Sequence, residues 1–165
     1  MHTAILALGS NVAPAKENLD RAVEAVKTLG QISEIAPYII SKPEGYIHQD
    51  DFINTVLILK TELAPIPLLR TLKKMETDLG RVKTFPNGPR VIDLDILFYD
   101  DLVLFEDTDD VTLCIPHPRI AEREFVLKPL SYIAGDFIHP SYNKPIYRLY
   151  RELMKKKGTP SCHIL

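Results

Sequence analysis

The chain has 165 residues, 45 % of them hydrophobic and 25 % charged, and a formal net charge of −2. This length is typical of one globular domain, residues 1–165, with enough apolar residues to bury a core. The near-neutral charge offers no basic field for nucleic acid or an anionic membrane, and no apolar run approaches the roughly 20 residues of a membrane span. Two cysteines without disulfide or metal-ligand spacing, and a first segment without a basic leader, suit a cytoplasmic protein.

The predicted elements alternate between strands and helices. In chain order they are a strand at 3–8, a helix at 13–30, strands at 32–40 and 51–63, and a helix at 64–80. Both helices carry apolar residues at helical spacing and end at a glycine, Gly30 or Gly80, where a C-terminal cap is expected. Pro43 and Gly45 break regular structure between the two central strands.

The second half of the chain adds one more strand and several smaller elements. Residues 88–97 read as a fourth strand that runs on through 97–104 as a hairpin, and a short helix is expected after the segment 114–135. Residues 147–165 read as a helix that then frays, so the part beyond about residue 150 is a candidate for a peripheral tail. The order β-α-β-β-α-β predicts an α+β fold of the ferredoxin-like type, with helices packed on one face of an antiparallel sheet and a hairpin and helices as C-terminal additions.

The least expected feature is a pair of aspartates in the apolar stretch IDLDIL. Successive side chains of a strand point to opposite faces, so Asp93 and Asp95 share one face, about 7 Å apart. One interpretation is a solvated strand face. The other is a pair of oxygen ligands for Mg²⁺, which prefers a few carboxylates together with water and substrate phosphates. Two such ions could clamp a triphosphate.

A basic loop directly before this strand favours the magnesium interpretation. The segment GRVKTFPNGPR, residues 80–90, carries the three cations Arg81, Lys83 and Arg90 together with two glycines and two prolines. Cations beside carboxylates suit a nucleotide–magnesium complex, and the loop has the composition of a phosphate-binding lid. The chain has neither a Walker loop nor a G-x-G-x-x-G motif, and LGSN after the first strand reads better as a turn.

Two further groups of residues suit a heterocycle and a nucleotide. Phe52 and Asn54 lie on one face of a strand, where an amide is costly unless it is paired. The donors and acceptor of Asn54 match a heterocycle edge with adjacent amine and carbonyl groups, although a hydrogen bond to a loop would explain the same residue. The segment PHPRIAEREF adds His117, Arg119, Arg123 and Phe125. A basic, aromatic turn of this kind fits a nucleotide, and a capped helix with surface arginines would look similar.

Five blocks together carry a resemblance to a known family. GPRVIDLDIL, GSN, FIN, the ME…LGR helix end and IPHPR…REF resemble the 6-hydroxymethyl-7,8-dihydropterin pyrophosphokinases of folate biosynthesis. The resemblance runs from the first strand to about residue 135. It implies a ferredoxin-like α+β fold and transfer of pyrophosphate from ATP to the pterin hydroxymethyl group, with release of AMP.

The resemblance also implies a role for each matching position. It assigns catalysis to Arg81, Arg90, Asp93 and Asp95, pterin binding to Ser41, Lys42, Pro43, Gly45, Phe52, Asn54 and Phe125, and nucleotide binding to Lys73, Glu76, Lys83, Arg90, His117, Arg119 and Arg123. The two aspartates would hold two magnesium ions, and ATP would be the co-substrate. The chain departs from some relatives at Lys73, Lys83, Pro86, Asn87 and Thr112, which puts loop closure and some nucleotide contacts in question.

Two other functions stay open at this stage. A ferredoxin-like small-molecule-binding regulator would share the fold without chemistry, but it would not need two carboxylates beside a cationic loop. A kinase that transfers only the γ-phosphate would use the same metals and cations. The oligomeric state is open as well, with a monomer as the simplest case.

Overall fold

The computed structural model describes residues 1–165. The first half contains β1 (His2–Ser10), α1 (Ala15–Val26), η1 (Lys27–Leu29), β2 (Gln31–Ile35), β3 (Ile39–Ser41), β4 (Phe52–Thr61) and α2 (Pro65–Asp78). The second half contains β5 (Asp93–Tyr99), β6 (Leu104–Asp107), β7 (Thr112–Ile115), η2 (Ile120–Glu122), α3 (Glu124–Ala134), β8 (Ile138–His139), β9 (Lys144–Pro145), α4 (Ile146–Lys157) and β10 (His163–Ile164). None of the helices has the length and apolar character needed to cross a membrane.

The predicted ferredoxin-like sheet is confirmed. Its strands follow the order β10-β3-β4-β1-β5, and β2 also pairs with β4. Every pair of neighbouring strands is antiparallel. The expected single strand at 32–40 is two strands, β2 and β3, because Pro37 cannot donate to the ladder. Both pieces pair with β4, so the interruption leaves the strand order unchanged.

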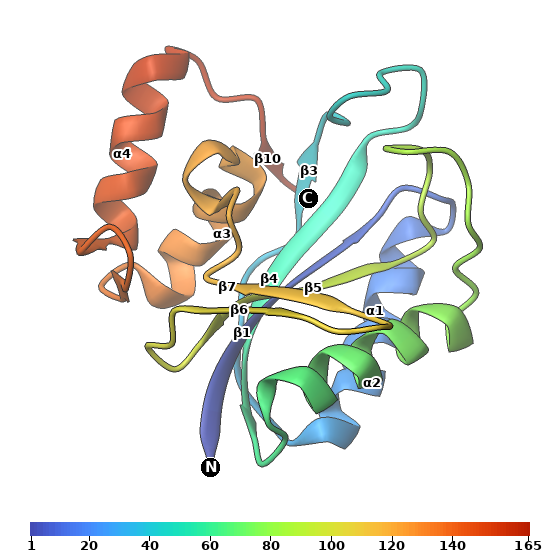
Figure 1. The fold of residues 1–165 in the computed structure, drawn as a ribbon. Coiled ribbons are helices and arrows are strands. Elements are labelled where there is room, and N and C mark those ends of the chain that lie inside the picture. The colour runs from blue at the N-terminus through green and yellow to red at the C-terminus, as the bar shows by residue number, and fades with distance from the viewer.

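Helices cover both faces of the sheet, as Figure 1 shows. On one face α1 and α2 bury Leu19, Val23 and Leu72 against alternate residues of the strands. On the other face α3 and α4 form a second core, which includes Leu127 and Leu149. The sequence predicted helices on one face only, and the second layer comes from the C-terminal additions. The sheet is therefore buried on both sides, which explains the nearly continuous apolar runs of its central strands.

Three expectations about the second half of the chain were wrong. The hairpin expected at 97–104 lies further along the chain, at residues 104–115, where β6 pairs with β7 and not with β5. The short helix expected after 114–135 lies inside that segment, as α3. The predicted frayed tail ends as a strand, since β10 pairs with β3. The pairing of β10 with β3 joins segments that are far apart in the chain, which local pattern does not show.

Candidate active site

The candidate site lies at one end of the sheet, on the face that carries α3. Three strands meet there in register: Gly9 of β1 pairs with Asn54 of β4 on one side and with Asp93 of β5 on the other. A Cβ atom at Gly9 would lie 2.7 Å from the Asn54 Oδ1 atom, so only glycine lets this amide rest on the β1 backbone. A cavity of about 750 Å³, including its open mouth, extends over this row of residues.

Asp93 and Asp95 share one face of β5, as predicted, and both line the cavity. Their side chains are 28 % and 35 % exposed, whereas Leu94 between them is fully buried in the opposite core. Burial, and then the charge of Asp93, raises the pKa of Asp95 to about 6. The interpretation of a simple solvated strand face does not fit this environment, because two carboxylates are held close together in a partly enclosed space.

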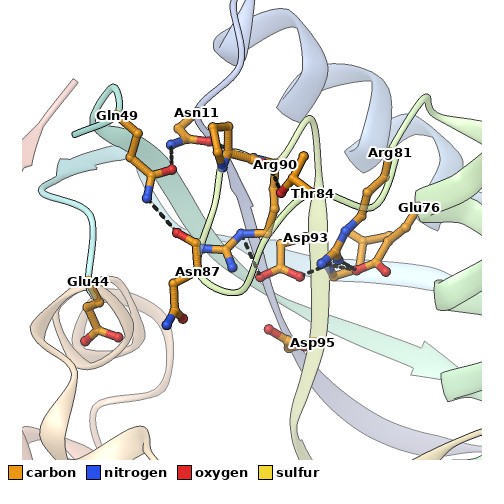
Figure 2. Close-up of polar contacts among 12 residues, drawn as sticks. Asn11, Glu44, Gln49, Glu76, Arg81, Thr84, Asn87, Arg90, Asp93 and Asp95 are labelled. Atoms are coloured by element: carbon orange, nitrogen blue, oxygen red, sulfur yellow. Dashed lines mark hydrogen bonds and ion pairs between the residues drawn. The ribbon is translucent and has the colours of Figure 1, made fainter. Parts of the chain in front are cut away.

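Basic residues from α2 and the following loop lie beside the aspartates, and Figure 2 shows Arg81 and Arg90 of the loop on either side of Asp93. An Arg81 Nη atom lies 2.8 Å from Asp93 and 3.0 Å from Glu76. Lys73 lies 3.5 Å from Glu76 and 3.8 Å from Asp95. Glu76 itself is buried, which raises its pKa, and its carboxylate accepts a 2.6 Å hydrogen bond from the Leu94 N–H. Acidic and basic side chains thus alternate along this edge of the cavity.

Arg90 is held at the cavity by Asn11, the residue that follows β1. The Asn11 side-chain oxygen accepts a hydrogen bond from the Arg90 N–H at 2.9 Å, and the Asn11 N–H donates to the Arg90 carbonyl at 3.1 Å. The guanidinium lies 4.8 Å from the centre of the Phe52 ring and 3.9 Å from Asp93. Its Nε atom is buried and has no hydrogen-bond partner, so this cation has donor capacity left for a ligand.

The same asparagine joins two loops above the cavity. Its amide donates to Gln49 Oε1 at 2.8 Å and to the Asp50 carbonyl at 2.9 Å. Gln49 in turn donates to the Asn87 carbonyl at 2.7 Å, a contact drawn in Figure 2. The loop between β3 and β4 is therefore linked to the basic loop at residues 80–90. Asn11 was predicted as a turn residue, and its linking role was not visible in the sequence.

Asn54 and the aromatic residues form the other side of the cavity. The Asn54 amide is 8 % exposed and donates a 2.6 Å hydrogen bond to the Ser41 hydroxyl at the end of β3. Phe52 and Phe125 also line the cavity. The Arg123 guanidinium lies 5.4 Å from the centre of the Phe125 ring. This side offers aromatic faces next to an amide, which is the combination expected for a flat, polar-edged ring.

His117 and Arg123 close the cavity between these two sides, and Glu44 faces them. Burial, followed by the charges of Arg123 and Arg119, lowers the pKa of His117 to about 4. The His117 Nδ1 atom accepts the Arg119 N–H at 3.1 Å, which leaves Nε2 as the hydrogen-bearing atom of the neutral ring. The Glu44 carboxylate lies 3.3 Å from Arg123 and 3.7 Å from Arg119.

The structure brings most of the predicted site residues together. Those that line the cavity are Ser41, Lys42, Phe52, Asn54, Arg90, Asp93, Asp95, His117, Arg123 and Phe125. Lys73 and Arg81 contact the aspartates, Glu76 contacts these two cations, and Arg119 contacts Glu44. The remaining three do not line it: Lys83 lies in an adjoining hollow of the basic loop, and Pro43 and Gly45 belong to the loop after β3.

Sequence reasoning missed several residues of the cavity wall. Glu44 and Thr55 line it without having been assigned a role, and Asn87 had been noted only as a departure. Glu44 stands next to the predicted Pro43 and Gly45, but a single acid in a loop reads as solvated. Its importance comes from two arginines of a distant segment.

The fold and the cavity define an α+β protein with carboxylates, cations, an amide and aromatic rings in one site, a set that suits a nucleotide and a heterocycle. The family model of 7,8-dihydro-6-hydroxymethylpterin-pyrophosphokinase (HPPK) matches residues 5–135. The chain therefore belongs to this family, and the resemblance read from its motifs is confirmed.

Comparisons with individual proteins agree. The chain is 39 % identical to the 2-amino-4-hydroxy-6-hydroxymethyldihydropteridine pyrophosphokinase of Aquifex aeolicus over 165 residues, which cover 100 % of this chain and 99 % of that protein. It is 43 % identical to the folic acid synthesis protein FOL1 of Dictyostelium discoideum over 82 % of this chain but only 20 % of that longer protein. The fold matches a crystal structure of Plasmodium falciparum HPPK-DHPS with a TM-score of 0.80 and 18 % identity, covering 94 % of this chain and 44 % of that one.

Proposed function

We propose that the cavity transfers pyrophosphate from ATP to the hydroxymethyl group of 6-hydroxymethyl-7,8-dihydropterin, giving AMP and the pterin diphosphate in folate biosynthesis. This is the reaction of the family to which the chain belongs, and it makes the chain an ATP-dependent pyrophosphokinase. One observation supports the assignment most directly. The register of three strands sets the Asn54 amide and the Asp93 carboxylate on either side of Gly9, which brings a heterocycle site and a polyphosphate site into one cavity.

The pterin binds on the side of Asn54 and the aromatic residues. The amide, oriented by Ser41, offers a donor and an acceptor to the polar edge of the ring. Phe52 and Phe125 contact the faces of the ring, where aromatic surfaces supply much of the affinity. Lys42 and the loop after β3, with Pro43 and Gly45, complete this side.

Asp93 and Asp95 are suited to bind magnesium. They are two carboxylates on one strand face, and both line the cavity. Burial, and then the charge of Asp93, raises the pKa of Asp95, and a bound cation would favour the ionised form of both carboxylates. Mg²⁺ prefers a few carboxylates plus water and phosphate oxygens, so this donor set fits. When bound, two ions would neutralise and align the triphosphate of ATP.

The cations of the site position the nucleotide. Arg81 and Arg90 lie on either side of Asp93, where they can neutralise phosphate oxygens as charge moves during the transfer. Lys73, Lys83, Arg119 and Arg123 extend this set along the nucleotide, Glu76 holds Lys73 and Arg81 in place, and neutral His117 directs its Nε2–H group as a donor. The pterin hydroxyl oxygen then forms a bond to the β-phosphorus while the bond from that phosphorus to the α-phosphate oxygen breaks. The protein contributes positioning and charge neutralisation more than covalent chemistry.

We propose that residues 1–165 act as a single pyrophosphokinase domain, because the family model spans residues 5–135 and every residue that lines the cavity lies in that range. The two cysteines are free, which suits the reducing cytoplasm as the site of the reaction.

Product analysis tests the proposal. The protein is mixed with Mg²⁺, ATP and 6-hydroxymethyl-7,8-dihydropterin, and the nucleotides are separated over time. We expect AMP to appear in step with pterin diphosphate. Release of ADP would mean γ-phosphate transfer and would refute the proposed reaction. Binding of both ligands without any product would instead indicate a binding module. The Asp95→Asn variant is the negative control, because it keeps the shape of the side chain.

A further inference from the structure

The segment from Thr159 to Leu165 is part of the folded structure. Its last residues form β10, which pairs with β3 through His163 and Ile164, and the Leu165 N–H donates to the Tyr38 carbonyl at 2.9 Å. Figure 1 shows this strand beside β3, next to the layer of α3 and α4. Cys162 is 2 % exposed, and its carbonyl accepts a 2.9 Å hydrogen bond from Lys128 of α3. The segment therefore fills the seam between β3 and α3.

A buried carboxylate at the first position of α3 holds this segment. The Glu124 side chain is 1 % exposed. It accepts hydrogen bonds from the Ser161 N–H at 3.1 Å, the Ser161 hydroxyl at 3.1 Å, the Cys162 N–H at 3.0 Å and the Lys157 ammonium at 2.8 Å. Burial alone would raise the pKa of Glu124, but these donors outweigh it and bring the pKa to about 2. A carboxylate is buried at acceptable cost only when it is paired in this way.

The residues joined by this contact lie on the pterin side of the cavity. Arg123 and Phe125, the immediate neighbours of Glu124, both line the cavity. At the other end of the seam, β3 ends at Ser41, whose hydroxyl accepts the Asn54 amide. Displacing residues 159–165 would leave Glu124 buried without most of its partners. The first turn of α3 and the end of β3 would then lose their common support.

We propose that Glu124 is a positioning residue for the pterin pocket. By binding residues 157–162, it fixes the first turn of α3 against β3 and so sets the distance between Phe125 and Asn54. It does not touch the substrate, because its side chain points into the seam. That the ligand of this pocket is the pterin rests on the proposed function. The coupling between residues 157–162 and α3 does not depend on that function.

Three full-length variants test this role. Glu124→Ala removes the acceptor, and Glu124→Gln keeps one oxygen for the Ser161 and Cys162 N–H groups while removing the charge. Ser161→Pro removes two donors without changing any residue of α3, so it serves if Glu124→Ala does not fold. Glu152→Ala is the matched control, because it removes a carboxylate of α4 that pairs with Lys144 and Arg148 and does not line the cavity.

We expect a selective loss on the pterin side. Glu124→Ala and Ser161→Pro should raise KM for the pterin by about tenfold to a hundredfold, with Glu124→Gln in between. KM for ATP should change by a smaller factor, about fivefold or less, because Arg123 adjoins Glu124 whereas Lys73, Arg81 and Arg90 lie outside the seam. Glu152→Ala should leave both values unchanged. Equal changes in both KM values, or a lower melting temperature with native kinetics, would overturn the positioning role.

Hydrogen exchange separates this inference from the proposed reaction. The Val126 and Leu127 N–H groups donate to the Arg123 carbonyl at 3.1 and 3.0 Å and close the first turn of α3. Their exchange should accelerate by at least about tenfold in Ser161→Pro and stay native in Glu152→Ala. If the native protein makes no pterin diphosphate but this acceleration occurs, the proposed function fails while the coupling holds. Native exchange at these amides in Ser161→Pro would refute the coupling itself.

Discussion

Replacing Asp95 with asparagine should make the metal-free protein more stable and inactive. The ordinary pKa of an aspartate is 3.8, and burial together with Asp93 raises that of Asp95 to about 6. This difference corresponds to a cost of roughly 3 kcal/mol for the ionised group at neutral pH. Because the side chain is 35 % exposed, solvent screening reduces the cost to about 1–2 kcal/mol. Lys73 loses one partner in the variant but keeps Glu76 at 3.5 Å.

The effect depends on pH in a defined direction. The folded state holds the Asp95 proton up to about pH 6, whereas the unfolded chain releases it near 3.8. The destabilisation by the ionised Asp95 carboxylate is therefore fully present above about pH 6, and it disappears below pH 3.8, the pKa of the group in the unfolded chain. With EDTA present, Asp95→Asn should melt about 2–6 °C above the native protein at pH 8, and this advantage should vanish near pH 4.

The same variant should lose its response to magnesium. Added Mg²⁺ should raise the melting temperature of the native protein, since a ligand that binds only the folded state stabilises it. Asp95→Asn should show little of this rise and form AMP at less than about one hundredth of the native rate. Asp78→Asn, at an exposed aspartate of α2 outside the cavity, is the control and should behave like the native protein. A variant that is less stable than the native protein at pH 8 in EDTA would refute the reasoning, because the surrounding cations would then more than balance Asp95.

Three further substitutions test other parts of the cavity. The imidazole NMR signal of His117 should titrate near pH 4, because burial and then the charge of Arg123 lower its pKa. His117→Gln should remove this signal and so assign it. A His117 signal that titrates near pH 6.5 would contradict the buried environment. Because the folded value lies below the unfolded one, native stability should fall as pH drops from 6.5 to 4, and less so in the variant. Glu44→Ala should lower KM for ATP by about threefold to tenfold at low salt, because it frees Arg123 and Arg119 from a competing carboxylate. An unchanged KM would show that Glu44 does not compete with the nucleotide for these arginines. Asn54→Leu should weaken pterin binding, measured by calorimetry, by about a hundredfold. It should also cost about 1–3 kcal/mol of stability, because it leaves the Ser41 hydroxyl without its donor. Pterin binding within threefold of native would contradict the proposed role of Asn54.

The central part of the fold was accessible from the sequence because its signals are local. Periodicity gave the two helices of the first layer, and alternation in β5 placed Asp93 and Asp95 on one face. Gly80 follows the end of α2 with a φ of 105°, a backbone conformation that glycine adopts easily because it has no Cβ atom. These patterns repeat within a few residues, so they can be read without knowing the tertiary structure.

The parts that were not predicted depend on partners far along the chain. The strand β10 exists because β3 offers an open edge and Glu124 binds the residues before it, 37 and 38 positions away. Asn11 looked like a turn residue because its partners Gln49, Asp50 and Arg90 lie 38 to 79 positions further on. Glu44 gains its role only from the arginines of another segment. No local propensity encodes such pairings, since each is decided by which surfaces the completed sheet brings together.

The charge network explains why an otherwise apolar strand can carry two aspartates. Arg81 contacts both Glu76 and Asp93, and Lys73 contacts both Glu76 and Asp95, so each cation has one partner that faces the cavity and one that is buried. The buried partner is fixed by the Leu94 N–H, which belongs to the same strand as the aspartates. When a ligand changes the partners of Asp93 and Asp95, Glu76 still holds both cations at the edge of the cavity. Glu76 would therefore keep Arg81 and Lys73 at the edge of the cavity where we propose that the phosphates bind.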